Sequence, residues 1–187
     1  MKLFQRIKDI LLTPSATWPK IEAEETDSAK IFTGYVMNIA LVPAIASFIG
    51  MSFFGIGIDG ERVRVPLLSG LSNAVVSYLL SLVMIYLLAK MANKMAPTFG
   101  GRQDPLMALK LIAYSSTAAM LGGIFSVFPS YAALGLAPTL YSVFLLARGI
   151  PVLMKSAPDR TITYTSILLI ATMVSGTLIG AISAAMR

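Results

Sequence analysis

The residues of this chain best suited to chemistry are polar side chains set inside long apolar segments. Three of them are spaced four residues apart, so they share one face of a helix. The set consists of Asn38, Asn73, Ser77, Ser81, Tyr114 and Tyr141. Amides, hydroxyls and phenols of this kind can form a hydrogen-bonded groove for a lipid headgroup or a small solute. They can also join helices, at about 0.6 kcal/mol per hydrogen bond in a membrane, and we favour this second interpretation.

A second set of candidates surrounds a loop that begins at Gly100 and Gly101. Glycine reaches backbone angles that are closed to other residues, and the following Pro105 suits the first position of a helix. The spacing therefore predicts a shaped loop with charged residues next to it. The candidate contacts for a partner or a lipid are Gly100, Gly101, Arg102, Asp104, Lys110 and Arg148.

The composition narrows the chemistry that these residues can perform. The 187 residues include neither cysteine nor histidine, which removes disulfides, thiolate sites and the commonest general base. The sequence also has no Walker A, HExxH or GxSxG motif. We therefore expect no enzymatic activity, no cofactor and no metal site.

The elements that must position the candidate residues are membrane spans. The chain is 56% hydrophobic and only 13% charged, which is far from the soluble average of about 25% charged residues. Pro129 divides one of the uncharged runs into two halves, and we expect Pro43 to kink another. The uncharged runs are 31–58, 65–89, 111–147 and 161–186. The sequence predicts an all-α polytopic membrane protein with five transmembrane helices, formed by residues 31–187 after a cytoplasmic segment, 1–30.

The N-terminal segment contains an amphipathic pattern, which predicts an interfacial helix on the inner membrane surface. Its apolar face is Leu3, Phe4, Ile7, Ile10 and Leu11, and its polar face is Lys2, Gln5, Arg6 and Asp9. Trp18 is interpreted either as an anchor among the headgroups or as part of an ordinary surface helix. The acidic group that follows is expected to be a solvated lead-in to the first span, and consists of Glu22, Glu24, Glu25 and Asp27.

The distribution of basic residues predicts the orientation. With the N-terminus in the cytoplasm, 12 of the 15 Lys and Arg residues lie inside, and only Arg62, Arg64 and Arg187 lie outside. An odd number of spans then places the C-terminus outside. This topology explains the net charge of +6 without nucleic acid. Attraction to anionic lipids remains consistent with it.

Small residues at spacings of four predict close helix packing. One ridge is Gly176, Gly180 and Ala184, a second is Ala118, Gly122 and Ser126, and a third is Ala40 and Ala44. Packing within one protomer is the simpler interpretation, and packing against a second copy is the alternative.

Three stretches of the chain resemble one known family. They are LLTPSATWPKI near the N-terminus, FGGRQDPLMALKLIAYSSTAAMLGGIFSVFP in the middle, and LYSVFLLARGIPVLMKSAPDR. Together they look like the short bacterial branch of the Yip (Ypt-interacting protein) domain family. The resemblance implies a five-span bundle with a cytoplasmic N-terminus. In eukaryotic members it also implies a role in vesicle trafficking through Rab-type GTPases, which we do not carry over because the tail is short and lacks an Asp-Leu-Tyr-Gly-Pro element.

The sequence therefore favours a non-enzymatic membrane protein that organises or scaffolds other membrane components through its cytoplasmic loops. The alternative is a small permease, channel or lipid-moving protein that uses the polar intramembrane face. The absence of Asp, Glu and His from the spans argues against a proton-coupled carrier. The expected partners are the lipid bilayer, including its anionic lipids, and a membrane protein or a second copy of the chain.

Overall fold

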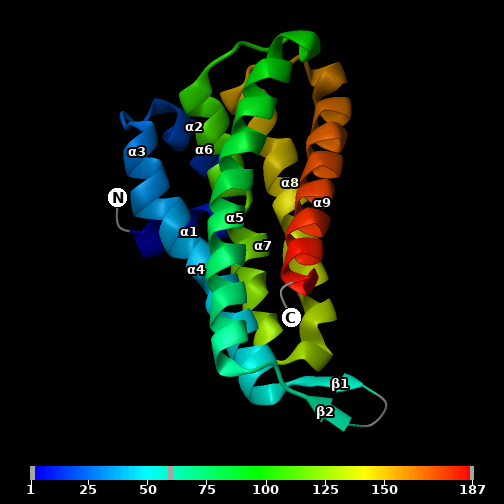
Figure 1. Ribbon diagram of the computed structural model, residues 1–187. Helices are drawn as coiled ribbons and strands as arrows, with labels where there is room; N and C mark the ends of the chain where they lie inside the picture. The colour runs from blue at the N-terminus through cyan, green and yellow to red at the C-terminus, as the bar shows by residue number, and fades with distance from the viewer. Residues whose placement is uncertain (1–2, 59–60, 186–187) are drawn as a thin grey trace.

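The computed structural model describes residues 3–58 and 61–185, and five of its helical segments are long and apolar enough to cross a membrane. They span Ser28–Phe54, Leu67–Phe99, Pro105–Val127, Ala133–Leu153 and Pro158–Ala185. Figure 1 shows them packed as one bundle. The predicted all-α, five-span architecture is confirmed. Lys2 and Arg187, which were named above, lie outside the described residues.

Each span is built around one or more α-helices. The first contains α3 (Ser28–Ile31) and α4 (Met37–Ile49), with π-helical turns at Phe32–Val36 and Gly50–Phe54. The later spans contain α5 (Leu67–Met95), α6 (Pro105–Ser115), α7 (Thr117–Gly122), α8 (Leu136–Leu153) and α9 (Thr161–Ala185). Turns of 3-10 helix occupy Ala96–Phe99, Gly123–Val127, Pro129–Gly135 and Pro158–Arg160. The division of the long apolar run at Pro129 follows the prediction.

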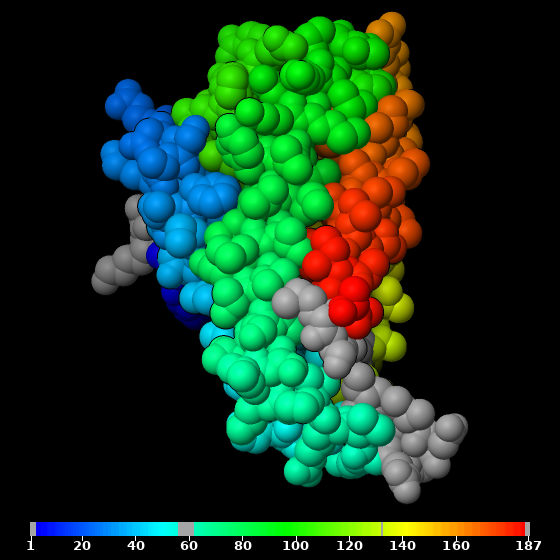
Figure 2. Space-filling view, viewed as in Figure 1, coloured from blue at the N-terminus to red at the C-terminus, as the bar shows by residue number. Residues whose placement is uncertain are grey.

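The third span lies at the centre of the bundle, and the fifth lies at its edge. In the most apolar part of each span, 61% of the third and 11% of the fifth is buried by protein. The segments approach each other closely at this centre. A Cβ added to Gly122 would lie 2.6 Å from Pro138 Cβ, and a Cβ added to Gly123 would lie 2.6 Å from Pro43 Cβ. In Figure 2 α9 forms one flank of the visible face, with α5 beside it. The bundle is therefore organised around α6 and α7.

The connection after the first span differs from the prediction. The helix ends at Phe54, and Gly55 turns the chain with a left-handed φ of 74°. Strand β1 (Ile56–Ile58) then pairs antiparallel with β2 (Glu61–Val63). Figure 1 shows this hairpin at the end of the bundle opposite the α5–α6 loop. The uncharged run 31–58 is therefore a span followed by a strand.

The N-terminal helices α1 (Leu3–Leu12) and α2 (Pro14–Ala23) pack against the bundle. The amphipathic helix forms as predicted, but its polar face is not all solvated, because Arg6 is 5% exposed. The prediction that Trp18 lies among the headgroups or on the surface is wrong. Its side chain is fully buried, and a Cβ added to Gly149 of α8 would lie 2.8 Å from the indole. Glycine at 149 allows α2 to approach α8 this closely.

Candidate functional site

Two loops at the same end of the bundle are joined by backbone hydrogen bonds. The Arg102 N–H donates to Met154 O at 2.8 Å, and the Ala157 N–H donates to Phe99 O at 3.1 Å. We call residues 97–104 and 154–160 together the loop surface. Figure 1 shows the α5–α6 loop and the start of α9 together at this end. These main-chain bonds join the two loops into one continuous surface.

The two predicted glycines are what allow this approach. Gly100 has a left-handed φ of 70° and ends the 3-10 turn Ala96–Phe99. A Cβ added to Gly101 would lie 2.5 Å from Met154 O, and Met154 O is the atom that accepts the hydrogen bond from Arg102. A side chain at position 101 would therefore push the two loops apart.

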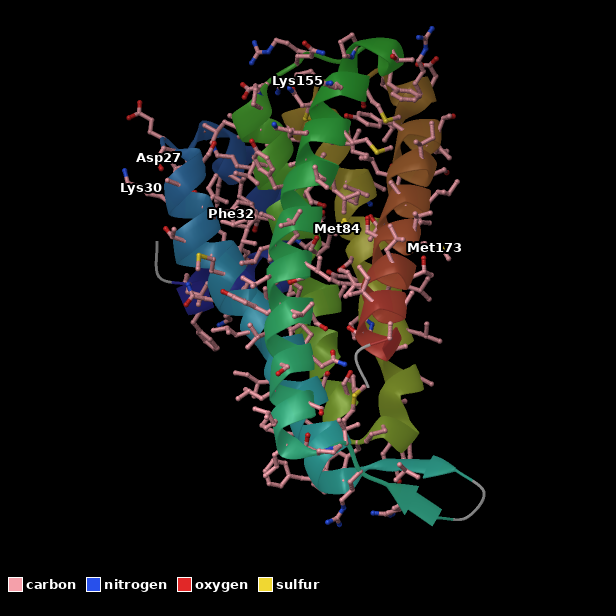
Figure 3. The ribbon with its side chains drawn as sticks, viewed as in Figure 1. Asp27, Lys30, Phe32, Met84, Lys155 and Met173 are labelled. Atoms are coloured by element: carbon pink, nitrogen blue, oxygen red, sulfur yellow. The ribbon has the colours of Figure 1, made fainter. Side chains whose placement is uncertain are left out.

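The exposed charges of the loop surface are three basic side chains, of Arg102, Lys155 and Arg160, and one carboxylate, of Asp159, which lies 3.9 Å from Arg160. The Arg102 side chain is 75% exposed and lies 3.8 Å from Asp104. Arg160 is also exposed, and its guanidinium donates to Thr98 O at 3.1 Å, which adds another link between the loops. Lys155 pairs with Glu22 of α2, so the N-terminal segment is attached to the same surface. Figure 3 shows Lys155 at this end of the bundle.

Two other predicted contact residues lie elsewhere. Lys110 is fully buried, and its ammonium donates to Ile21 O at 2.7 Å and to Glu24 O at 2.8 Å. It fastens the N-terminal segment to α6 and is not available to a partner. Arg148 is exposed on α8 with its guanidinium over the Phe144 ring, 5.3 Å from the centroid, about one and a half helical turns before the loop surface begins.

Asp104 has a structural role that the loop prediction did not assign. Its carboxylate accepts hydrogen bonds from the Leu106 and Met107 N–H groups, at 3.0 and 3.1 Å, and so caps α6. Pro105 takes the first helical position, as expected. The Asp–Pro pair therefore fixes the point at which the loop ends and the central helix begins.

The polar intramembrane residues do not form one face. Asn73 donates to Ser183 O at 2.8 Å, and Ser77 lies 2.7 Å from the Ser183 hydroxyl, so both join α5 to α9. Asn38 is exposed and donates to Thr33 O of its own span. Ser81 likewise donates to its own helix, at Tyr78 O.

The two tyrosines of the predicted set face the N-terminal segment. The Tyr141 hydroxyl donates to Leu11 O at 2.6 Å. The buried Tyr114 ring lies edge-on to Tyr35, with the centroids 4.6 Å apart, and under the guanidinium of Arg6. These two residues hold α1 against the bundle.

Among residues 3–58 and 61–185, the small-residue ridge on α9 has no packing partner. A Cβ added to Gly176 or Gly180 would meet no atom within 4 Å, and Ala184 is exposed. By contrast, Ala118 and Gly122 of the second ridge are buried where α7 meets its neighbours. The simpler interpretation, packing within the protomer, therefore describes the central ridge and not the one on α9.

Sequence reasoning missed the charge network of the N-terminal segment. Arg6 pairs with Glu24, and Lys155 pairs with Glu22. Asp27 caps α3 by accepting the Lys30 N–H, and this bond together with the Lys30 ammonium holds the pKa of the Asp27 carboxyl below its ordinary value. The available signal was the density of charges in 1–30, which the sequence analysis assigned to solvent.

The comparisons with known proteins agree with a membrane protein. A family model described as "Yip1 domain" matches residues 8–179. The chain is 24% identical, over 157 residues, to a protein of Escherichia coli K12 named "Inner membrane protein YohC", covering 82% of this chain and 80% of that protein. The protein of the same name from Escherichia coli O6:H1 matches to the same extent. No solved structure matches the chain.

Proposed function

Because this chain is an integral membrane protein of the Yip1 domain family, we propose that it organises other membrane components through its loop surface. The observation that carries this proposal is the pair of hydrogen bonds that fix residues 97–104 to residues 154–160. A surface that is ordered in advance loses little conformational entropy when a partner binds. Its exposed Arg102 and Arg160 suit an acidic segment of a membrane protein or anionic lipid headgroups.

The proposal includes an orientation and a location. The excess of Lys and Arg near the loop surface favours the cytoplasmic side for this end of the bundle, with the N-terminus inside and the C-terminus outside. The name of the Escherichia coli relative supports the inner membrane of a bacterium. Neither that name nor the family description states an enzymatic activity.

The alternative, a permease, channel or lipid-moving protein, receives less support from the geometry. It depended on a polar face that lines a groove. Asn73 and Ser77 are hydrogen-bonded to α9, and Ser81 is bonded within its own helix. These bonds favour helix packing over a solute path.

Photo-crosslinking in cells tests the proposal. A photoreactive amino acid at the exposed Gln103 lies between Arg102 and Asp104, and a matched control at the exposed Leu68 lies at the hairpin end. We expect a discrete protein captured from position 103 and not from position 68. Capture of lipid or of the chain alone from both positions would contradict scaffolding.

A charge reversal refines the test. Arg102→Glu combined with Arg160→Glu should reduce the captured product, whereas Arg102→Lys combined with Arg160→Lys should retain most of it. Both pairs keep the main-chain Arg102 N–H to Met154 O bond and both remove the Arg160 guanidinium that donates to Thr98 O, so the comparison between the two pairs isolates the sign of the charge. An unchanged yield in the reversed variant would show that the surface charges do not recruit the partner.

A further inference from the structure

A polar cavity of about 280 Å³ lies between α1 and the start of the first span, apart from the loop surface. Figure 1 shows α1 on the same flank of the bundle as α3. The walls come from α1, from the segment between α2 and α3, from the first span and from α6. The residues that line it are Leu3, Arg6, Glu24, Glu25, Thr26, Lys30, Ile31, Gly34, Tyr35 and Tyr114.

Arg6 forms the floor of this cavity. The residue is 5% exposed, its guanidinium pairs with the Glu24 carboxylate, and its Cζ lies 5.3 Å from the Tyr114 ring centroid. A guanidinium carries five N–H donors, and within the described residues Arg6 makes a single side-chain hydrogen bond, to Glu24. The remaining donors of a buried cation are therefore available to a ligand in the cavity.

The carboxylate beside Arg6 is also held in place. The main-chain oxygen of Glu24 accepts a hydrogen bond from the buried ammonium of Lys110, at 2.8 Å. Lys110 therefore fixes the main chain of Glu24, and Arg6 alone holds its carboxylate. Glu25, the next residue, is exposed and lines the same cavity.

The charges that line the cavity balance, with two cations, Arg6 and Lys30, and two carboxylates, Glu24 and Glu25. A purely anionic ligand would meet repulsion from the carboxylates. A ligand with a phosphate and an ammonium group within a few ångströms satisfies both signs. We propose that the cavity binds a phosphodiester carrying a primary ammonium, namely a phosphoethanolamine headgroup, with the phosphate on Arg6 and the ammonium at Glu25.

The position of the mouth favours a ligand that is part of a lipid. Lys30 is the last charged residue before the uncharged part of the first span, and Gly34 lies about one helical turn further into the membrane. In the described part of the chain, a Cβ added to Gly34 would meet no neighbouring residue within 4 Å, so the cavity is open there. Figure 3 shows Lys30 at the outer edge of the molecule, where a neighbouring phospholipid would lie. Phosphates commonly contact Lys and Arg at this depth.

This site goes beyond the proposed function, since it uses none of the residues of the loop surface. Ligand binding at this site also explains why a buried arginine lies near the membrane edge. A hydrophobic residue at position 6 would pack against Tyr114 without requiring a paired carboxylate.

Binding of short-chain lipids to the purified, delipidated full-length chain tests the inference. Native mass spectrometry in detergent would be used to titrate dioctanoyl phosphatidylethanolamine, phosphatidylglycerol and phosphatidylcholine. We expect the ethanolamine lipid to bind at least tenfold more tightly than the other two. Equal affinity for the three lipids would overturn the proposal. Soluble glycerophosphoethanolamine should compete only weakly, and competition as strong as that of the lipid would assign the site to a soluble ligand instead.

Variants that keep the fold separate this site from general lipid contact. Gly34→Leu fills the mouth and should raise the Kd for the ethanolamine lipid at least tenfold. Gly176→Leu is the matched control, since both glycines have open space around them, and should leave the Kd unchanged. Glu25→Gln should remove the preference for ethanolamine over glycerol headgroups. Wild-type binding by Gly34→Leu, or an unchanged preference in Glu25→Gln, would each contradict the assignment.

Discussion

The substitution Gly101→Ala tests whether the two loops of the loop surface are locked together. An added Cβ would lie 2.5 Å from Met154 O and 3.1 Å from Ala96 O, both main-chain atoms that cannot rotate away. Overpacking of this kind costs about 1–3 kcal/mol, and the loss of the Arg102 N–H to Met154 O bond adds about 1 kcal/mol. We expect the free energy of unfolding to fall by about 2–4 kcal/mol, roughly 30- to 900-fold in the unfolding equilibrium.

Two other glycines provide controls. Gly100→Ala places an alanine at a left-handed φ of 70° and should cost about 1–2 kcal/mol. Gly180→Ala adds a methyl group to open space on α9 and should be neutral or stabilising by up to about 1 kcal/mol. The expected order of destabilisation is therefore Gly101 first, Gly100 second and Gly180 last.

The assay is unfolding in mixed micelles, followed by the fluorescence of the single tryptophan. Trp18 is fully buried between α2 and α8, so its emission reports the loss of tertiary packing. The crosslinking yield from Gln103 should fall in Gly101→Ala even at temperatures where the bundle stays folded. If Gly101→Ala unfolded like Gly180→Ala, the two loops would not be locked, and the support for a preformed surface would be lost.

Three further outcomes are expected. Lys110→Met leaves the Ile21 and Glu24 carbonyls without their donor and should lower the free energy of unfolding by about 2–4 kcal/mol. In the same assay, Lys94→Met at an exposed position should change this free energy by less than about 0.5 kcal/mol. Asn73→Leu breaks the bond from α5 to Ser183 O and should cost about 0.6–1.7 kcal/mol, and a larger loss would mean that this residue does more than join helices. A cysteine at Phe4 should react more slowly with a membrane-impermeant maleimide than one at Gln5, because α1 turns Phe4 towards lipid, and equal rates would refute that placement.

The spans and their number followed from the sequence because a bilayer imposes a physical requirement that is local in the chain. A helix that crosses the membrane needs about 20 consecutive apolar residues, and such runs can be read directly. The loop glycines and Pro105 were also local signals. The hairpin was missed because an uncharged run such as Ile56–Ile58 extends a span in hydropathy, whereas only the turn at Gly55 separates strand from helix.

The burial of charged residues did not follow from the sequence because it depends on partners far along the chain. Arg6 is 18 residues from Glu24, and Lys110 is 89 residues from Ile21. Amphipathic periodicity assigns Arg6 to solvent, since it treats one face of the helix as free, and the nearby glycine loop assigned Lys110 to a contact surface. The sequence therefore predicted the part of the candidate site that is formed by the loop backbone. It assigned Lys110 to this site wrongly, because a distant segment of the chain covers the Lys110 side chain.

The contacts of α1 and α2 have a consequence for the order in which the protein matures. These helices leave the ribosome before the spans do, and Tyr141, whose hydroxyl donates to Leu11 O, and Gly149, which contacts Trp18, are synthesised about 130 residues later. The N-terminal segment can contact Lys110 and Tyr114 once the third span has been inserted, but its docking is complete only after the fourth span has followed. Its docking is a late step of biogenesis, so a bulky fusion ahead of α1 would hinder completion of the bundle while leaving insertion of the individual spans unaffected.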